Sequence, residues 1–553
     1  MTIYDSPVEE VRYVDAPLEQ SLEASSSIPF FSTAYIVANQ TKDIAETIKS
    51  YGFGEVDPVF KEQHAVNMVE RVSNAATYSL LFAGIALDAG LLGGLAAPLA
   101  LAGSSLFVGY TNSLEHPSTE ILGLNAECNN APLLNQYKDG HSVIVTQDSL
   151  DSFKWKKELV KSAKHSIELS GSFCAGEAFQ EILSMMEDKL KENPELQIRI
   201  LCTPDLLEGK DKTRLKELES AFPFNFHVLL CDRIPVTTPG ISLPENHVKI
   251  IIIDEEYFIV GGSNLQESML SSGEGIEPER QGRTILEKLS GSNWRDMDMV
   301  SKGPAAKTLR LEFYKLWAKW AYLEKREGHL VSHYKKVDSR DAYCFAFESS
   351  ADKVNDVALK IVAASPLFTN NEITKEYCRL LDEAILEKKD VTIANMIFNP
   401  PEELIDKIKL AVSSGCKVTI LSTNLQENGA VSNHLFFTAN RDGFIKVYKA
   451  AEDAHLGHNL EIYEYNVPDG IFHKKVWLIG DDISIFSSAN LGMKSHLYDD
   501  ELSIVVKSKE VADKMRQILE KDKTLSKKLQ YNEILSIESV FKGAFGQLLT
   551  EFM

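Results

Sequence analysis

The pattern of apolar and polar residues changes character near residue 140. From there on, short apolar runs of strand length alternate with longer segments whose apolar residues recur every three to four positions. Strands that alternate with amphipathic helices predict a β-sheet with helices packed on its faces. The fold class of the chain beyond residue 140 is therefore predicted to be α/β.

The predicted elements follow the same order in two successive stretches. In the first stretch, strands are predicted at 142–146, 166–169, 197–202, 225–230, 248–253 and 257–260, and helices at 150–164, 177–191 and 210–221. In the second, strands are predicted at 391–398, 417–422, 445–448, 460–465, 476–479 and 483–486, and helices at 374–386, 402–413 and 431–439. A duplicated α/β unit explains this repetition.

A polar connector separates the two stretches. Residues 328–355 contain few periodic apolar positions and follow the end of a predicted helix. We therefore expect a mainly helical N-terminal region at 1–139, domains at 140–327 and 356–525, and a C-terminal tail or helix at 526–553. A chain of 553 residues is indeed longer than one hydrophobic core usually serves.

The N-terminal region contains a long apolar segment at 72–114. Asp88 is its only charged residue, and the part from 89 to 114 is long enough to cross a bilayer. A membrane-inserting hairpin and a pair of buried helices both fit this segment. The first residues lack the features of a classical signal peptide, so we expect a cytoplasmic or membrane-associated protein. A bacterial enzyme of the cytosol and a protein delivered into a host cell would share these features.

The net charge argues against a nucleic-acid-binding protein, and the cysteine spacing argues against a disulfide-bonded one. A net charge of −22 and a pI near 5.1 oppose non-specific binding to nucleic acid, whose backbone is polyanionic. Nucleic acid is therefore not the favoured partner. The seven cysteines are widely spaced without a Cys-x-x-Cys pair, which favours free thiols over disulfides.

A histidine motif occurs once in each half. The first copy is His247-x-Lys249 with Asn264, and the second is His473-x-Lys475 with Asn490; in both, the Asn follows the His by 17 residues. Two such matches are expected by chance in roughly one chain in a thousand of this composition. Two histidines brought together with lysines and asparagines could bind a phosphate, with one ring attacking phosphorus and one transferring a proton.

These residues resemble the phospholipase D superfamily, whose signature is His-x-Lys-(x)4-Asp-(x)6-Gly-Ser-x-Asn, present twice. The first copy also matches at Asp254 and Gly261, and it has Gly262 where Ser is usual. The second copy departs at two positions: Gly480 replaces the signature Asp, and Ser487 replaces the Gly. Asp481 is adjacent to Gly480, but a shift of one residue on a strand turns a side chain to the other face. The resemblance implies two pseudo-symmetric α/β/α sandwich domains.

The resemblance also implies further site residues. An acidic residue beyond each signature would orient one His, which nominates Asp296 in the segment Trp294-Arg295-Asp296, with Asp298 as the less certain candidate. In the second half it nominates Glu501. Two serines of the signatures, Ser263 and Ser488, would contact substrate, and Asp254 is a less certain site residue.

The implied mechanism is a double displacement at phosphorus that needs neither a metal nor another cofactor. The lysines and asparagines would hold the non-bridging oxygens. By analogy with the family, His247 would attack phosphorus and His473 would transfer protons, although nothing in the sequence itself distinguishes the two rings.

The function expected on these grounds is that of a phospholipase D-type phosphodiesterase or phosphatidyltransferase acting on phospholipids at a membrane surface. Two alternatives stay open. One is a nuclease of the same superfamily. The other is a catalytically impaired lipid-binding or scaffolding protein, which the irregular second signature permits.

Overall fold

The computed structural model describes residues 134–534 with internal gaps. The residues left undescribed within that range are 205–206, 232–244, 275–292, 324–336, 338, 365–371, 425–430, 469 and 498. The N-terminal region and its apolar segment at 72–114, and the tail beyond 534, therefore lie outside the described residues. Among the described helices, none combines the length and apolar character needed to cross a membrane.

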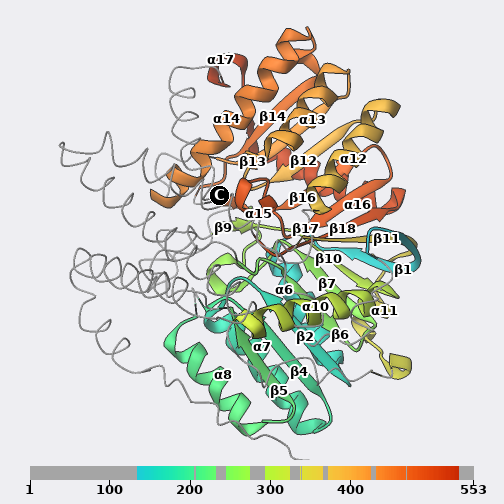
Figure 1. Ribbon diagram of the computed structural model, residues 1–553, viewed down its shortest axis with the longest axis vertical. Coiled ribbons are helices and arrows are strands. Elements are labelled where there is room, and N and C mark those ends of the chain that lie inside the picture. Colours follow the sequence, from blue (N-terminus) through green and yellow to red (C-terminus); the bar gives the residue numbers. More distant parts are fainter. Residues whose placement is uncertain are drawn as a thin grey trace, which may run out of the picture. The chain divides into compact units, whose positions relative to one another are not determined.

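Fifteen strands of the described chain form one continuous sheet (Figure 1). Its strands in chain order are β1 (Tyr137–Val145), β2 (Ser166–Gly171), β4 (Gln197–Cys202), β5 (Phe226–Leu230), β6 (Ile250–Ile253), β7 (Tyr257–Gly261), β10 (Asp298–Lys302), β11 (Val354–Ala364), β12 (Val391–Asn395), β13 (Val418–Thr423), β14 (Leu460–Tyr465), β16 (Lys475–Ile479), β17 (Ile483–Ser487), β18 (Glu501–Lys507) and β19 (Ser526–Lys528). Two small sheets pair β15 (Gly470–Phe472) with β9 (Asn293–Arg295), and β3 (Cys174–Ala175) with β8 (Leu265–Gln266).

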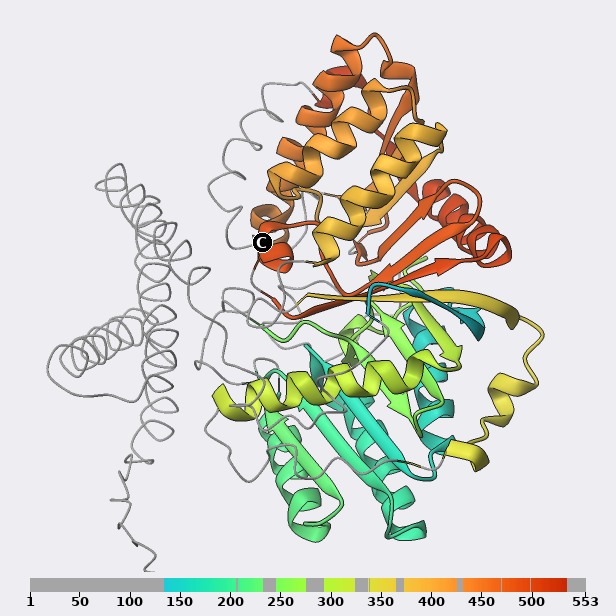
Figure 2. The same ribbon diagram turned by 45° about the vertical axis from the view of Figure 1, so that its right-hand side comes forward.

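The sheet has the same strand order in both halves. The first half runs β5-β4-β2-β6-β7-β10-β1, and the second runs β14-β13-β12-β16-β17-β18-β11. In each half, the first three strands of this order are parallel and the others pair antiparallel. Strand β19 pairs antiparallel with β14 at the edge of the second half. Strands β1 and β11 pair antiparallel with each other and join the halves, as Figure 2 shows. The duplicated α/β unit predicted from the sequence is present.

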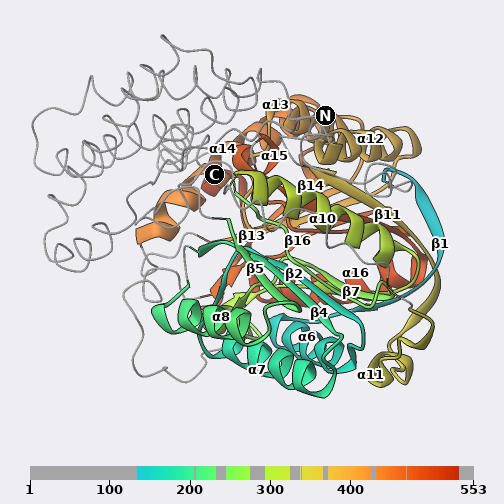
Figure 3. The ribbon, with the colours of Figure 1, turned by 60° about the horizontal axis from the view of Figure 1, so that its bottom comes forward.

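Helices cover the sheet in layers. They are α6 (Ser149–Ser162), α7 (Gly176–Glu192), α8 (Gly209–Ala221), α10 (Ala305–Leu323), α11 (Phe345–Glu348), α12 (Glu372–Glu387), α13 (Glu402–Ser413), α14 (Val431–Asp453), α15 (Met493–Leu497), α16 (Lys509–Thr524) and α17 (Tyr531–Ile534). Helices α6, α7 and α8 share one hydrophobic core with the first half, and α12, α13 and α14 share another with the second. A third core unites α10 and α16 with strands of both halves. Figure 3 shows α10 between α7 and α8 on one side and α12 and α13 on the other.

One predicted element is wrong. The strand expected at 445–448 is part of α14, which continues to Asp453 instead of ending near 439. The run Ile445-Lys-Val-Tyr has the β-branched composition of a strand. However, its buried neighbours Phe444, Val447 and Ala451 recur at intervals of three and four residues, which is the helical period. The six cysteines within the described residues are free thiols, as predicted.

Candidate active site

His247 lies just before β6 and is held from the second half of the chain. Its Nδ1 is 2.7 Å from Oε1 of Glu501, at the start of β18. Its backbone N–H donates to the carbonyl of Asp500 at 3.0 Å. Only 7% of the surface of His247 is exposed, so the ring and the Glu501 carboxylate form a buried pair.

His473 has the mirror arrangement, held from the first half. It follows β15, and its Nδ1 is 2.5 Å from Oδ2 of Asp296. Its backbone N–H donates to the carbonyl of Arg295 at 2.8 Å. The structure therefore pairs each histidine with the acidic residue of the other half. A carboxylate at Nδ1 fixes the tautomer that leaves Nε2 to face a substrate.

The two signature lysines bring both histidines into one cluster. Lys249 Nζ donates to Ser172 Oγ at 2.8 Å and to the His247 carbonyl at 2.9 Å. Lys475 Nζ lies 2.8 Å from the His473 carbonyl and 3.0 Å from its Nε2. Burial is the main cause that lowers the pKa of both histidines, and the charges of Lys249 and Lys475 each lower both values further. The lysine of each signature therefore lies close enough to act on the histidine of the other signature.

Burial also shifts the pKa values of the surrounding charged groups. It lowers the pKa of Lys249 to about 8 and that of Lys475 to about 7. It raises the pKa of Asp296 to about 6 and that of Glu501 to about 7. An anionic phosphate bound between the lysines would favour their charged forms.

The two signature asparagines have unused hydrogen-bonding capacity. Asn264 is buried and its Nδ2 donates to Met269 Sδ at 3.4 Å. The Oδ1 atoms of Asn264 and Asn490 are buried and have no hydrogen-bond partner among the described residues. Since buried polar atoms are normally paired, these two oxygens are suited to a hydrogen-bond donor on a ligand.

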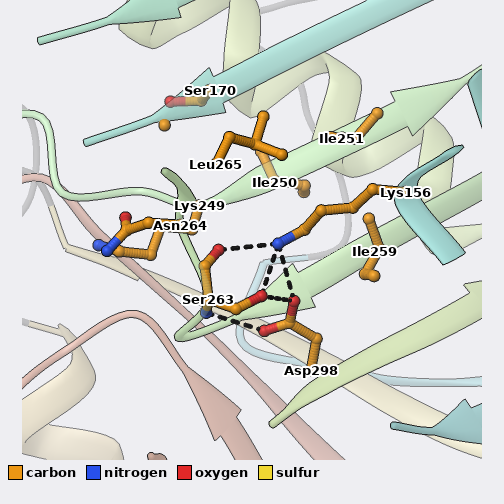
Figure 4. Close-up of a pocket in the computed structure, with 11 residues that line it drawn as sticks. Lys156, Ser170, Lys249, Ile250, Ile251, Ile259, Ser263, Asn264, Leu265 and Asp298 are labelled. Carbon is orange, nitrogen blue, oxygen red and sulfur yellow. Dashed lines mark hydrogen bonds and ion pairs between the residues drawn. The ribbon is translucent and has the colours of Figure 1, made fainter. Parts of the chain in front are cut away.

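The serine hydroxyls of the two signatures contact protein carboxylates. Ser263 Oγ donates to Asp298 and accepts from Lys156 Nζ at 2.5 Å, and Lys156 lies 3.1 Å from Asp298 (Figure 4). Ser488 Oγ donates to Glu501 and accepts from the Leu502 N–H at 3.0 Å. Asp298 thus pairs with Lys156 and Ser263, whereas Asp296 pairs with a histidine.

Sequence reasoning did not single out Lys156. This residue lies on α6 next to Lys154 and Lys157, and such a run of lysines is typical of a solvated helix face. The structure buries Lys156 beside a small cavity that Lys249 and Asn264 also line. Only the position of its helix over the end of β7 explains the burial, and no local sequence signal indicates that position.

The signature Asp has a local structural role. Asp254 lies at the turn between β6 and β7 with φ +54°, and its carboxylate accepts the N–H groups of Lys164, His165 and Ser166 at 2.7–2.9 Å. Gly480 takes the same place between β16 and β17 with φ +61°. A left-handed turn residue is therefore needed in both copies, and glycine provides it without strain.

Asp481 does not replace the signature Asp. Its side chain is 85% exposed and lies 3.5 Å from Arg516. The departure at Gly480 thus removes a contact that stabilises a turn, and it leaves the histidine cluster unchanged.

Two buried ion pairs flank the cluster. The residue before the paired carboxylate is basic in the first half and acidic in the second. Arg295, one residue before Asp296, donates to Asp522 of α16 at 2.6 Å. Asp500, one residue before Glu501, pairs with Lys319 of α10. Both pairs join the two halves, so they fix the segments that carry the orienting carboxylates. Within the described residues, no group of three potential metal ligands occurs.

The fold and the site together define a duplicated α/β protein whose halves share one buried histidine–lysine cluster. A family model described as "Cardiolipin synthase, PLD-like domain" matches residues 377–523. Cardiolipin synthase 1 of Staphylococcus epidermidis is 25% identical over 434 residues, which cover 76% of this chain and 74% of that protein. The cardiolipin synthase of Halalkalibacterium halodurans is 26% identical over 373 residues, or 66% of this chain and 63% of that protein.

A solved structure agrees with the fold. The phosphatidylserine synthase of Haemophilus influenzae matches with a TM-score of 0.52 at 15% identity, covering 77% of this chain and 96% of that one. Together with the sequence relatives, this confirms the resemblance drawn from the duplicated signature. Residues 377–523 match a PLD-like domain, and the chain as a whole is similar to cardiolipin synthases.

Proposed function

We propose that this protein is a phospholipase D-type phosphatidyltransferase that acts on phospholipids at a membrane surface. The observation that carries the proposal is the crossed pair of buried contacts, His247 with Glu501 and His473 with Asp296. The similarity to cardiolipin synthases over about three quarters of the chain supports phospholipid as the substrate class. Because phospholipids assemble into bilayers, the reaction takes place at a membrane surface.

The chemistry is a double displacement at phosphorus. One imidazole attacks the phosphodiester and forms a phosphohistidine while the other protonates the departing alcohol. The second imidazole then removes a proton from the incoming hydroxyl group, which displaces the first. Two in-line steps give net retention of configuration at phosphorus.

The remaining side chains of the cluster stabilise the developing charge. Lys249 and Lys475 are placed on opposite halves beside the rings, where their ammonium groups can donate to the non-bridging oxygens. The amide N–H groups of Asn264 and Asn490 would donate to the same oxygens. Preorganised donors in a buried site stabilise a transition state more strongly than water does. Ser263 and Ser488 would contribute by holding the surrounding carboxylates and loops in position.

The test uses the full chain with phosphatidylglycerol vesicles. Mass spectrometry would follow cardiolipin and glycerol, the transfer products, and phosphatidic acid, the hydrolysis product. Single-stranded DNA in a parallel reaction tests for nuclease activity. We expect lipid products from the wild type and none from His247→Ala or His473→Ala. DNA cleavage without lipid turnover would contradict the proposal, and no turnover of either would favour a scaffolding role.

A further inference from the structure

The two halves place chemically different side chains at equivalent positions beside the histidines. Two residues before each histidine stand Glu245 in the first half and Ile471 in the second. Two residues before the paired carboxylates stand Asp499, before Glu501, and Trp294, before Asp296. The backbone pairing is equivalent as well, since Asn246 bridges to Asp500 as Phe472 pairs with Arg295. The site is therefore symmetric in its histidines and asymmetric in its walls.

The wall beside His473 is apolar. Met269, Trp294 and Ile471 form a buried cluster, and the partly buried Phe173 and Met396 pack against it. The Trp294 ring centroid lies 4.6 Å from that of His473. We call these five residues the apolar wall.

The wall beside His247 is charged. Lys494 Nζ lies 2.5 Å from Glu245 Oε2 and 3.1 Å from Asp499 Oδ2, and the Glu245 N–H donates to Asp499 at 3.0 Å. The remaining carboxylate oxygen, Glu245 Oε1, is buried without a hydrogen-bond partner among the described residues. A buried, unpaired acceptor is costly and is suited to a hydroxyl donor from a ligand. We call Glu245, Lys494 and Asp499 the charged wall.

From this asymmetry we propose that the phospholipid binds in one orientation, with the hydroxyl-bearing headgroup against the charged wall and the diacylglycerol side against the apolar wall. In-line displacement places the departing alcohol on the face of phosphorus opposite the nucleophile. The headgroup therefore departs beside His247, which makes His247 the proton-transfer group and His473 the nucleophile. This reverses the roles suggested by family analogy, and it rests on the proposed phosphatidyltransferase function.

The surroundings of His473 agree with its role. Lys475 Nζ lies 3.0 Å from His473 Nε2, and in its charged form it donates to the neutral ring nitrogen that a nucleophile needs.

Each step balances in bonds and protons. The Nε2 lone pair of His473 forms the N–P bond while the P–O bond to the headgroup breaks, and that oxygen takes a proton from His247 Nε2. An incoming hydroxyl group then gives its proton to His247 as its oxygen bonds to phosphorus. The N–P bond breaks in this step and returns its electron pair to His473.

A substrate whose leaving group needs no proton separates the two roles. The p-nitrophenyl ester of phosphatidic acid, in mixed micelles with the full chain, releases p-nitrophenolate without a general acid. We expect His247→Ala to release one equivalent per chain and then stop, because the second step lacks its base. His473→Ala should release none, and circular dichroism verifies that both variants are folded.

The outcomes are distinct. A one-equivalent burst from His473→Ala would overturn the proposed orientation. The absence of a burst from both variants, while the wild type turns over, would overturn it as well. Either outcome leaves the phosphatidyltransferase proposal intact. No release by the wild type, together with no lipid turnover, counts against the function itself. Independently of any variant, an alkaline quench of the wild type followed by peptide mapping should place the adduct on the peptide with His473. An adduct on the peptide with His247 refutes the inference.

The charged wall is tested by comparing two substrates. Glu245→Gln should raise KM for phosphatidylglycerol about tenfold more than for the p-nitrophenyl ester, since only the former offers hydroxyl donors to the carboxylate. Ile471→Ala, the equivalent position of the apolar wall, should affect both substrates to the same degree. Equal losses from Glu245→Gln with both substrates would show that the charged wall does not contact the headgroup.

Discussion

Replacing Gly262 by serine restores the family signature in the first copy, and we predict that it lowers activity. A Cβ atom at this position would lie 2.3 Å from Oδ1 of Asp296, 3.0 Å from its Cγ and 3.1 Å from its Oδ2. The carboxyl group of Asp296 thus occupies the space that a serine side chain would need. In the second copy, Ser488 coexists with the longer Glu501 and donates a hydrogen bond to it.

The expected loss follows from the distance that Asp296 must move. Ordinary contact begins at 3.4 Å, so the carboxyl group must shift by about 1 Å (3.4 − 2.3). Its Oδ2 lies 2.5 Å from His473 Nδ1, so a shift of this size breaks or misaligns that contact. A displacement of about 1 Å near reacting groups costs about 100-fold in rate, or about 2.7 kcal/mol of activation free energy.

The assay compares kcat of the wild type and Gly262→Ser on phosphatidylglycerol vesicles at a temperature where circular dichroism shows both to be folded. Gly209→Ser is the matched control, because no atom lies within 4 Å of a Cβ built at that glycine. We expect the control to retain wild-type kcat. If Gly262→Ser also retained it, Asp296 would not orient His473 in the reaction, and the reasoning would be refuted.

Three other changes test single contacts. Gly480→Asp should leave kcat unchanged, because the signature Asp stabilises a turn in the first copy; a gain in kcat would contradict this. Arg295→Met should lower the free energy of unfolding, measured in urea, by about 1–3 kcal/mol, because Asp522 loses the Arg295 hydrogen bond and keeps Lys474 as its buried ion-pair partner; an unchanged free energy of unfolding would argue against it. Burial raises the pKa of Glu501 from 4.5 to about 7, so the native state binds more protons and loses stability as pH rises through this range. The stability of Glu501→Gln relative to wild type should therefore increase from pH 4.5 to 7 and then level off, and a flat difference would contradict the shift.

The sequence predicts the strands that carry the signatures well, because these strands are buried on both faces. The runs before and after Asp254 are almost continuously apolar, and they form β6 and β7 within two residues of the predicted bounds. The strand at 197–202 is identical in prediction and structure. In α14, the β-branched composition of a short run imitates a strand, although its buried residues recur with the helical period.

The site was only partly predictable, because its residues contact each other across long separations in the sequence. His247, His473 and the nominated carboxylates could be found because a motif with fixed spacing occurs twice. The contacts between them could not, since His247 meets a carboxylate 254 residues away. The charged wall was missed because no local sequence pattern distinguishes Glu245. The backbone pairing of the structure is needed to show that Glu245 and Ile471 occupy equivalent positions in the two halves.

The crossed carboxylates make the chemistry depend on the union of the two halves. Asp296 belongs to the first half and contacts Nδ1 of His473, whereas Glu501 belongs to the second and contacts Nδ1 of His247. A separated half would keep its histidine and lysine and lose the carboxylate at Nδ1, together with the backbone hydrogen bond that holds the histidine. The buried ion pairs of Arg295 and Asp500 run between the halves for the same reason, since each fixes the residue next to an orienting carboxylate. Duplication within one chain thus keeps the two histidines equivalent in their contacts and leaves their walls free to differ, which is what a substrate with one polar and one apolar end requires.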